Sequence, residues 1–191
     1  MTILQQTVAS GRHLTREEVE AGLDVIRAAP RDAGLLELIV RRPGVDEREV
    51  VDEAELDLDE GLVGDNWLAR GRSSGRKSAS PDAQITVTSA RAIALVAGSR
   101  DRWPLAGDQL YVDLDLSRDN LPPGTRLAIG TAELEVTAAP HTGCKKFASR
   151  FGLEALKVFD TEEGLALNLR GINTRIVVPG TVRAGDAVRK L

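Results

Sequence analysis

The chain has 191 residues, which is enough for one domain with a substantial core. Its formal net charge of -4 and aromatic content of 3% argue against a sequence-independent nucleic-acid binder, because such proteins need a basic surface and stacking aromatics. No uncharged apolar run is long enough to span a membrane, and the first residues do not resemble a secretory signal. The single cysteine, Cys144, excludes an intrachain disulfide and a multi-cysteine metal site. We therefore expect a cytoplasmic protein with an aliphatic core and with neither membrane nor nucleic acid as a partner.

The first predicted element is a helix over residues 15–29. Thr15 and Glu18 have the spacing of a capping box, and apolar residues share one face of the helix. We assign residues 1–33 to a helical extension and residues 34–191 to one larger domain.

Strands dominate the sequence after this extension. Apolar runs or alternation between turn residues are typical of strands. The expected strands cover residues 34–42, 49–58, 85–88, 109–114, 126–129, 133–138, 175–178 and 187–189, the second of them with a solvated acidic face. Short helices are expected over residues 89–97, 145–150 and 153–159. These elements predict a mostly β fold with a few short helices (α+β), its strands forming a barrel or a sandwich.

Cys144 is the main candidate for a chemical role. The start of the helix expected after it, together with Lys145 and Lys146, would stabilise a thiolate. The alternative is a buried structural cysteine, since free cysteine is among the most buried residue types. His141 lies three residues away in sequence. It could act as a general base toward Cys144, but a lone loop histidine is more often solvated, and that is what we expect. No acidic residue beside it is evident, so the sequence does not predict a Cys-His-Asp triad.

Two polar segments are candidates for binding an anion. Residues 70–80 carry four positive charges and no negative one, but they lack the glycine spacing of a phosphate-binding loop. We expect them to form a flexible, solvated basic loop. Arg118 and Asn120 offer a guanidinium fork and an amide, although taken alone their segment is typical of an ordinary β-turn.

The order of the glycine-rich and polar segments resembles that of a known family. The matching segments are GLVGD (61–65), ITVT (85–88), GDQL (107–110), RDNLPPG (118–124), GCKKF (143–147), RGINTR (170–175) and VRAGD (182–186). With the single cysteine in its expected place, this order is similar to that of the MOSC domain, named for the C-terminal part of molybdenum cofactor sulfurase. The resemblance covers roughly residues 34–191.

The resemblance implies a distorted β-barrel of the MOSC type with the cysteine at the mouth of a pocket. It also implies a protein that binds the molybdenum cofactor (molybdopterin) or carries sulfur as a cysteine persulfide. Cys144 falls on the family's cysteine, as the persulfide carrier or as a ligand of molybdenum. Arg118, Asn120 and Arg170 fall on the family's polar turns, and with Lys145 they are the expected cofactor-binding residues.

The same resemblance implies partners and leaves alternatives. In the full sulfurase a separate pyridoxal-phosphate domain generates the sulfur; this chain is too short to include it, so we expect a sulfur donor such as a cysteine desulfurase. A redox partner or a molybdoenzyme is a further expected partner. Two other functions stay open. One is a non-catalytic module that binds a small anion or a protein and has a structural cysteine, and the other is a detoxifying reductase component for N-hydroxylated bases.

Overall fold

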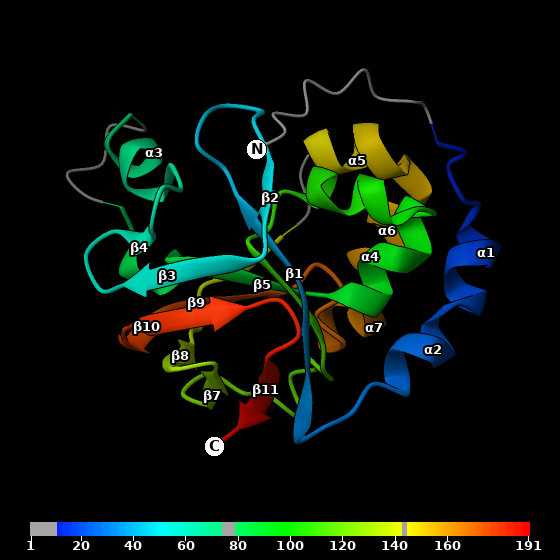
Figure 1. The fold of residues 1–191 in the computed structure, drawn as a ribbon. Coiled ribbons are helices and arrows are strands. Elements are labelled where there is room, and N and C mark those ends of the chain that lie inside the picture. Colours follow the sequence, from blue (N-terminus) through cyan, green and yellow to red (C-terminus); the bar gives the residue numbers. More distant parts are fainter. Residues whose placement is uncertain (1–10, 74–78, 143–144) are drawn as a thin grey trace.

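A closed barrel of seven strands forms the centre of the part of the chain described by the structure, a computed structural model (Figure 1). The structure describes residues 11–73, 79–142 and 145–191, apart from the side chains of residues 71–73. The barrel strands are β1 (Ala33–Arg41), β5 (Ile85–Ser89), β6 (Leu110–Asp113), β7 (Arg126–Ile129), β8 (Ala132–Val136), β9 (Ile172–Val178) and β11 (Ala187–Lys190). Their order around the barrel is β11-β7-β8-β9-β5-β6-β1, and pairing of β1 with β11 closes it. The expected β-barrel is confirmed.

The barrel is mixed, because β5 and β6 pair in parallel while the other neighbours are antiparallel. A parallel pair needs a crossover connection, and α4 (Ala90–Ala97) lies in the connection between β5 and β6. The strand β2 (Glu49–Val51) pairs with the end of β1. A second, smaller sheet contains β10 (Gly180–Arg183), β3 (Glu53–Asp57) and β4 (Gly61–Leu62).

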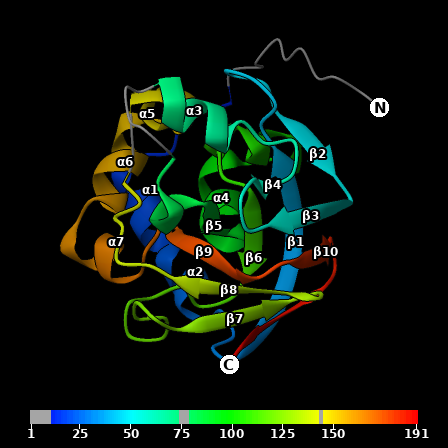
Figure 2. The same ribbon diagram turned by 90° about the vertical axis from the view of Figure 1, so that its left-hand side faces the viewer.

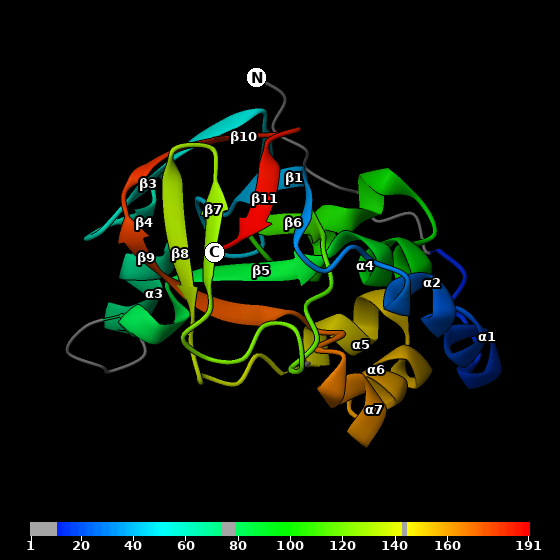
Figure 3. The ribbon, with the colours of Figure 1, turned by 90° about the horizontal axis from the view of Figure 1, so that it is seen from below.

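Most of the helices lie on one side of the barrel, as Figure 3 shows from below. They are α1 (Arg16–Ala21), α2 (Leu23–Arg27), α4, α5 (Lys145–Phe151), α6 (Leu153–Phe159) and α7 (Glu162–Ala166). The helix α3 (Trp67–Ser73) lies on the opposite side, and the 3-10 helices are η1 (Pro81–Ala83) and η2 (Arg100–Ala106). None of the helices in the described ranges is long and apolar enough to cross a bilayer.

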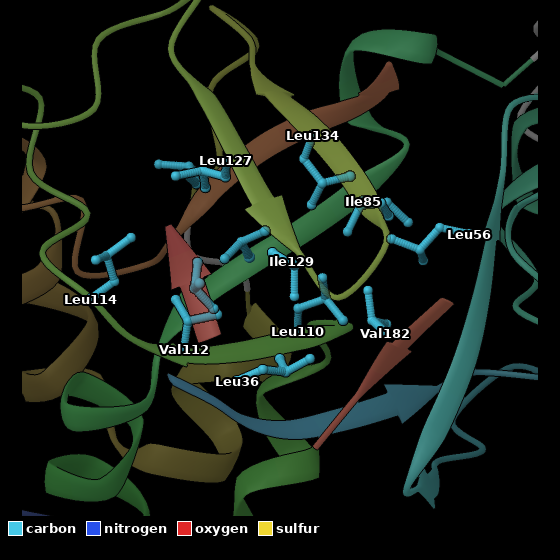
Figure 4. Packing of buried hydrophobic residues seen from close by; sticks show 14 of the residues in the cluster. Leu36, Leu56, Ile85, Leu110, Val112, Leu114, Leu127, Ile129, Leu134 and Val182 are labelled. Carbon is cyan, nitrogen blue, oxygen red and sulfur yellow. The ribbon is translucent and has the colours of Figure 1, made fainter. Parts of the chain in front are cut away.

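Two hydrophobic clusters pack against the barrel strands, one on the inner face and one on the outer face. The cluster inside the barrel contains only aliphatic side chains among the described residues, including Leu36, Leu110 and Leu134 (Figure 4). The cluster between the barrel and the helices contains five of the six aromatic residues of the chain. Alternation along β6 illustrates the division, because Leu110 belongs to the inner cluster and Tyr111 to the outer one. The expected aliphatic core is therefore confirmed for the barrel interior, whereas the aromatic residues stabilise the attachment of the helices.

The single helix expected over residues 15–29 is wrong, although its capping box is present. The Thr15 side chain accepts from Glu18 N–H, but the helix ends at Ala21 and a second helix begins at Leu23. A Cβ at Gly22 would lie 2.4 Å from Leu95 Cδ1 of α4, so the chain passes close to α4 at the break between the two helices. Both helices pack on the rest of the chain, α1 against α6 and α2 against α4. The boundary at residue 33 stays a prediction.

The predicted strand over residues 49–58 is in fact two strands. The first strand, β2, pairs with β1, and the second, β3, pairs with β10. Between β2 and β3, the Asp52 carbonyl accepts a hydrogen bond from Ala184 N–H. The expected acidic face is confirmed in β3, where Glu53 and Glu55 are exposed while Ala54 and Leu56 are buried. The remaining expected strands and helices are present with boundaries shifted by up to three residues, whereas β4, β10, α3, α7 and the two 3-10 helices were not predicted.

The barrel interior should dominate stability. We expect Leu110→Ala to lower the free energy of unfolding by about 2–5 kcal/mol, because it leaves a cavity among fully buried aliphatic side chains. The matched change Leu58→Ala, at a side chain that is 51% exposed, should cost about 0.5 kcal/mol or less. Denaturant unfolding of both variants measures the difference, and equal losses would contradict the assignment of Leu110 to the core.

Candidate functional site: an arginine-rich pocket

A cavity of about 760 Å³ lies at one end of the barrel, between the β1–β2 loop, α3 and α5. In Figure 1, α3 and α5 lie on opposite sides of the loop that leads from β1 to β2, and in Figure 2 both helices lie near the top of the view. The lining residues include Arg42, Asp46, Arg48, Trp67, Arg70, Thr86, Gly107, His141, Thr142, Lys146, Phe147, Arg150, Arg170 and Asn173. They come from segments as far apart as the end of β1 and the start of β9, so closure of the barrel brings them together.

Positive charge dominates this cavity even though the whole chain is acidic. Six cationic side chains line it among the described residues: Arg42, Arg48, Arg70, Lys146, Arg150 and Arg170. Asp46 contributes the sole carboxylate in the same set of lining residues. A recess lined by charge of one sign concentrates ligands of the opposite sign, so the arrangement is suited to a small anionic ligand.

A buried carboxylate, Asp108, lies behind the cavity wall. Its Oδ2 accepts a hydrogen bond of 2.8 Å from Arg170, and its Oδ1 lies 3.1 Å from His141 Nε2. Burial by itself would raise the pKa of Asp108, but the adjacent Arg170 and His141 lower the pKa below its usual value. Asp108 therefore stays ionised and fixes two lining side chains at once.

Arg170 links this carboxylate to helix α5. Its guanidinium also donates to the Ala106 carbonyl at 3.1 Å and lies 4.7 Å from the ring centroid of Phe147. A cation over an aromatic face is attractive, and more so away from water. Arg170 therefore holds α5, which carries Lys146 and Arg150, against the end of the barrel.

His141 is not the solvated loop residue that we expected. Its side chain is 13% exposed, and Asp108 is the acidic partner that the sequence did not reveal. The Asn173 side chain fixes the preceding segment by donating to the carbonyls of Ala139 and Pro140. Nε2 is the ring nitrogen beside Asp108, and Nδ1 is the one that remains for another partner. Nδ1 is buried and has no hydrogen-bond partner within residues 11–73, 79–142 and 145–191.

Arg42 has a mainly structural role at the cavity edge. It forms a two-pronged ion pair with the buried Asp65, at 2.8 and 2.9 Å, and donates to the Gly107 carbonyl at 2.8 Å. Asp65 also accepts from Trp67 N–H, at the first residue of α3. This pair therefore positions α3 and its Trp67 and Arg70 side chains beside the cavity.

Arg48 lies in an unfavourable environment for its charge. Burial, followed by the nearby Arg150 and Arg42, lowers its pKa, and burial followed by Arg42 lowers the pKa of Arg70. The Nε of Arg48 is buried and has no hydrogen-bond partner within the described part of the chain. A bound anion would compensate this charge, and Arg48 is therefore a strong candidate for ligand binding.

Only part of the predicted site falls on this cavity. Arg170 lines it, and Cys144 lies outside the described residues. Thr142 and Lys146, on either side of Cys144 in the sequence, both line the cavity. Lys145 is exposed at the first residue of α5 and is not among the lining residues.

Arg118 and Asn120 do not line the cavity. Asn120 is buried and donates to the carbonyls of Arg31 and Asp115, while its Oδ1 accepts from Lys190 in β11. Arg118 is exposed, and its backbone N–H donates to the Ala166 carbonyl. In this structure the turn therefore connects the start of β1 with β11, away from Arg170.

The sequence did not reveal four other residues of the site. Arg42, Arg48 and Arg150 line the cavity, and Asp108 holds two lining residues in place. For Arg42 the sequence did contain a signal. Arg41 and Arg42 come directly before Pro43-Gly44, which places two positive charges at the end of a predicted strand. Arg150 and Asp108 had no comparable local signal. The predicted basic loop over residues 70–80 was partly wrong, since Arg70 lies within α3, and residues 74–78 lie outside the described residues.

Comparison with known proteins gives one family and a consistent fold. A family model described as MOSC domain matches residues 74–189. The YuaD protein from Bacillus subtilis has 21% identity and a TM-score of 0.56, covering 82% of this chain and 94% of that one. YiiM from Escherichia coli has 19% identity and a TM-score of 0.53, covering 82% and 69%. YiiM from Geobacillus stearothermophilus has 13% identity and a TM-score of 0.52, covering 85% and 74%. No match was found among curated proteins.

Removing the charge of Asp108 should destabilise the protein strongly. We expect Asp108→Asn to lower the free energy of unfolding by about 3–5 kcal/mol at pH 7, because Arg170 would be left without its buried counterion. The folded-state pKa of Asp108 is lowered, so its stabilisation is present above the unfolded pKa of about 4 and is lost as pH falls below it.

Denaturant unfolding at pH 7 and between pH 4 and 2.5 measures this effect. The gap between wild type and variant should narrow as the pH falls. The control Asp24→Asn removes a carboxylate that is 89% exposed and paired with Arg27, and should change stability by about 0.5 kcal/mol or less. A loss in Asp108→Asn no larger than in this control would refute the role of Asp108.

Proposed function

Because the chain belongs to the MOSC domain family, we propose that its arginine-rich pocket binds the molybdenum cofactor and that Cys144 ligates molybdenum or carries sulfur as a persulfide. The family as a whole is associated with this cofactor. The observation that carries the proposal is the cationic cavity whose lining includes Thr142 and Lys146, each two residues from Cys144 in the sequence.

The described residues fit the chemistry of such a ligand. The molybdenum cofactor carries a phosphate, a pterin with N–H donors and a molybdenum–sulfur centre. Arg48, Lys146 and Arg150 supply guanidinium and ammonium donors for the phosphate. His141 Nδ1, which is buried and has no hydrogen-bond partner among the described residues, offers a further polar contact for the pterin. The cavity thus offers cations for the phosphate and a separate polar ring nitrogen for the pterin.

Two roles of Cys144 follow from thiolate chemistry. When bound, the cofactor supplies a molybdenum–sulfur centre, and soft thiolate ligands suit such a metal. As a sulfur carrier, the Cys144 thiolate would attack the outer sulfur of a persulfide on a donor such as a cysteine desulfurase. A sulfur–sulfur bond then forms at Cys144, the bond in the donor breaks, and the donor leaves as a thiolate. Positive charge such as that of Lys146, two residues from Cys144 in the sequence, would favour the ionised thiol.

A non-catalytic anion-binding module is the second candidate, because the cationic cavity supports it equally. In that case Cys144 would be structural and its replacement would leave ligand binding intact. Sulfur and metal analysis of a cysteine variant therefore separates the two candidates.

Replacing the cysteine should abolish loading with molybdenum or sulfur. We expect protein from a cofactor-producing host to contain molybdenum or cyanolysable sulfur, and Cys144→Ser to retain less than about a tenth of it, because a hydroxyl neither forms a persulfide nor binds a soft metal well. Metal analysis and cyanolysis measure the loading. Ser149→Ala, an exposed position on α5 outside the cavity lining, serves as the control and should load normally. Normal loading of folded Cys144→Ser would remove the cysteine from the proposed function.

Arg48 should strengthen binding of the cofactor while lowering the free energy of unfolding of the protein without ligand. We expect Arg48→Ala to bind the cofactor about tenfold or more weakly, since a charge-assisted hydrogen bond is lost. Its free energy of unfolding should be at least that of wild type, because burial and neighbouring arginines disfavour the Arg48 charge. Molybdenum retention during dialysis and denaturant unfolding give the two values. Arg126→Ala, in β7 and outside the cavity lining, should retain molybdenum normally; a loss of stability with unchanged retention in Arg48→Ala would contradict the assignment.

A further inference from the structure

Three carboxylates neutralise cations of the pocket, and they differ in exposure. Asp65 pairs with Arg42 and Asp108 pairs with Arg170, and the side chains of these two carboxylates are at most 1% exposed. Asp46 pairs with Lys146 and Arg150, and its side chain is 52% exposed. The first two carboxylates are fixed parts of the wall, whereas the third lies where a ligand can reach it.

Asp46 occupies the position of an anion between two cations. A single oxygen, Oδ1, accepts from Lys146 Nζ at 2.7 Å and from Arg150 at 3.1 Å. Both cations come from α5, and Asp46 itself lies in the loop between β1 and β2, on the other side of the contact. These charges lower the pKa of the Asp46 carboxyl, so the carboxylate is ionised at neutral pH.

The backbone at Asp46 restricts what can replace it. Its φ is 61°, in the left-handed region that favours glycine and is tolerated by asparagine and aspartate. The loop therefore presents this carboxylate to α5 in a conformation that few residue types adopt readily. Val45, the residue before it, is 80% exposed, so burial of apolar side chains does not hold the tip of the loop in place.

We propose that Asp46 is an internal substitute for the phosphate of the pocket's ligand: it holds Lys146 and Arg150 in the free protein and is displaced when the phosphate binds there. Both side chains of the Asp46–Lys146 pair are more than half exposed, and an exposed ion pair contributes little to stability, so breaking this pair costs little free energy. A phosphate offers more charge and more acceptor oxygens than one carboxylate, and Arg48 lies in the same cavity to bind it as well. The inference rests on the proposed function in one respect, that the ligand is phosphorylated.

The assignment predicts that Asp46 competes with phosphate. We expect Asp46→Asn and Asp46→Gly to bind inorganic phosphate about three- to tenfold more tightly than wild type, because the competing charge is gone. Both replacements suit a φ of 61°, so neither should disturb the loop. Titration at constant ionic strength, followed by the fluorescence of the lining residue Trp67 and by amide shifts in α5, measures the affinity.

The neighbouring Glu47 provides a matched control. Glu47→Gln removes the same formal charge one residue away, at a side chain that does not line the cavity, and should leave the affinity unchanged. Adding Lys146→Ala to Asp46→Gly should abolish the gain. Equal or weaker phosphate binding by both Asp46 variants, an equal gain in Glu47→Gln, or no phosphate binding by any of these proteins would overturn the proposal.

This measurement is independent of the test of function. Inorganic phosphate contains neither molybdenum nor sulfur, so the result does not depend on Cys144. A gain in the Asp46 variants, in a protein that loads with neither molybdenum nor cyanolysable sulfur, would support the phosphate subsite and reject the proposed function. Molybdenum loading without tighter phosphate binding by the Asp46 variants would support the proposed function and reject the phosphate subsite at Asp46.

Discussion

The ionised carboxylate of Asp108 is the constraint on which the pocket depends. A charge buried this deeply is stable only with partners of opposite charge or with hydrogen-bond donors, so Arg170 and His141 must both approach it. Those two residues come from distant segments, and Arg170 further holds Phe147 of α5 beneath its guanidinium. One buried charge therefore fixes the start of β9, the segment before Cys144 and the helix after it.

The division into two hydrophobic clusters explains why the pocket lies at the end of the barrel and not inside it. Aliphatic side chains of the described residues fill the barrel interior. The helices pack outside through aromatic residues, among them Phe147, Phe151 and Phe159, so α5 stands beside the barrel end and not across it. The cavity is the space between the rigid barrel end and this separately supported helix.

Local patterns predicted the elements whose causes are local. The strand at residues 126–129 and the helix begun by Ser89 agree with the structure, because alternation and capping act over a few residues. The breaks at Gly22 and Asp52 lie against Leu95 and Ala184, which are distant in sequence and could not be read from the local pattern. The site likewise depends on residues that are distant in sequence. The order of segments identified the family and the cysteine, but the cations at the end of β1, in α3 and in α5 come together only in the closed barrel.

The acidic net charge of the chain and its cationic pocket are compatible because the carboxylates have different roles. Within the described residues, six cations line the cavity and three carboxylates neutralise some of them, which leaves a surplus of positive charge. Asp65 and Asp108 are buried, so they preserve the wall in the absence of a ligand. Asp46 is accessible, and a dianionic phosphate that replaces it reduces the surplus further. An acidic protein can thus be unsuited to nucleic acid and still select a small phosphorylated ligand.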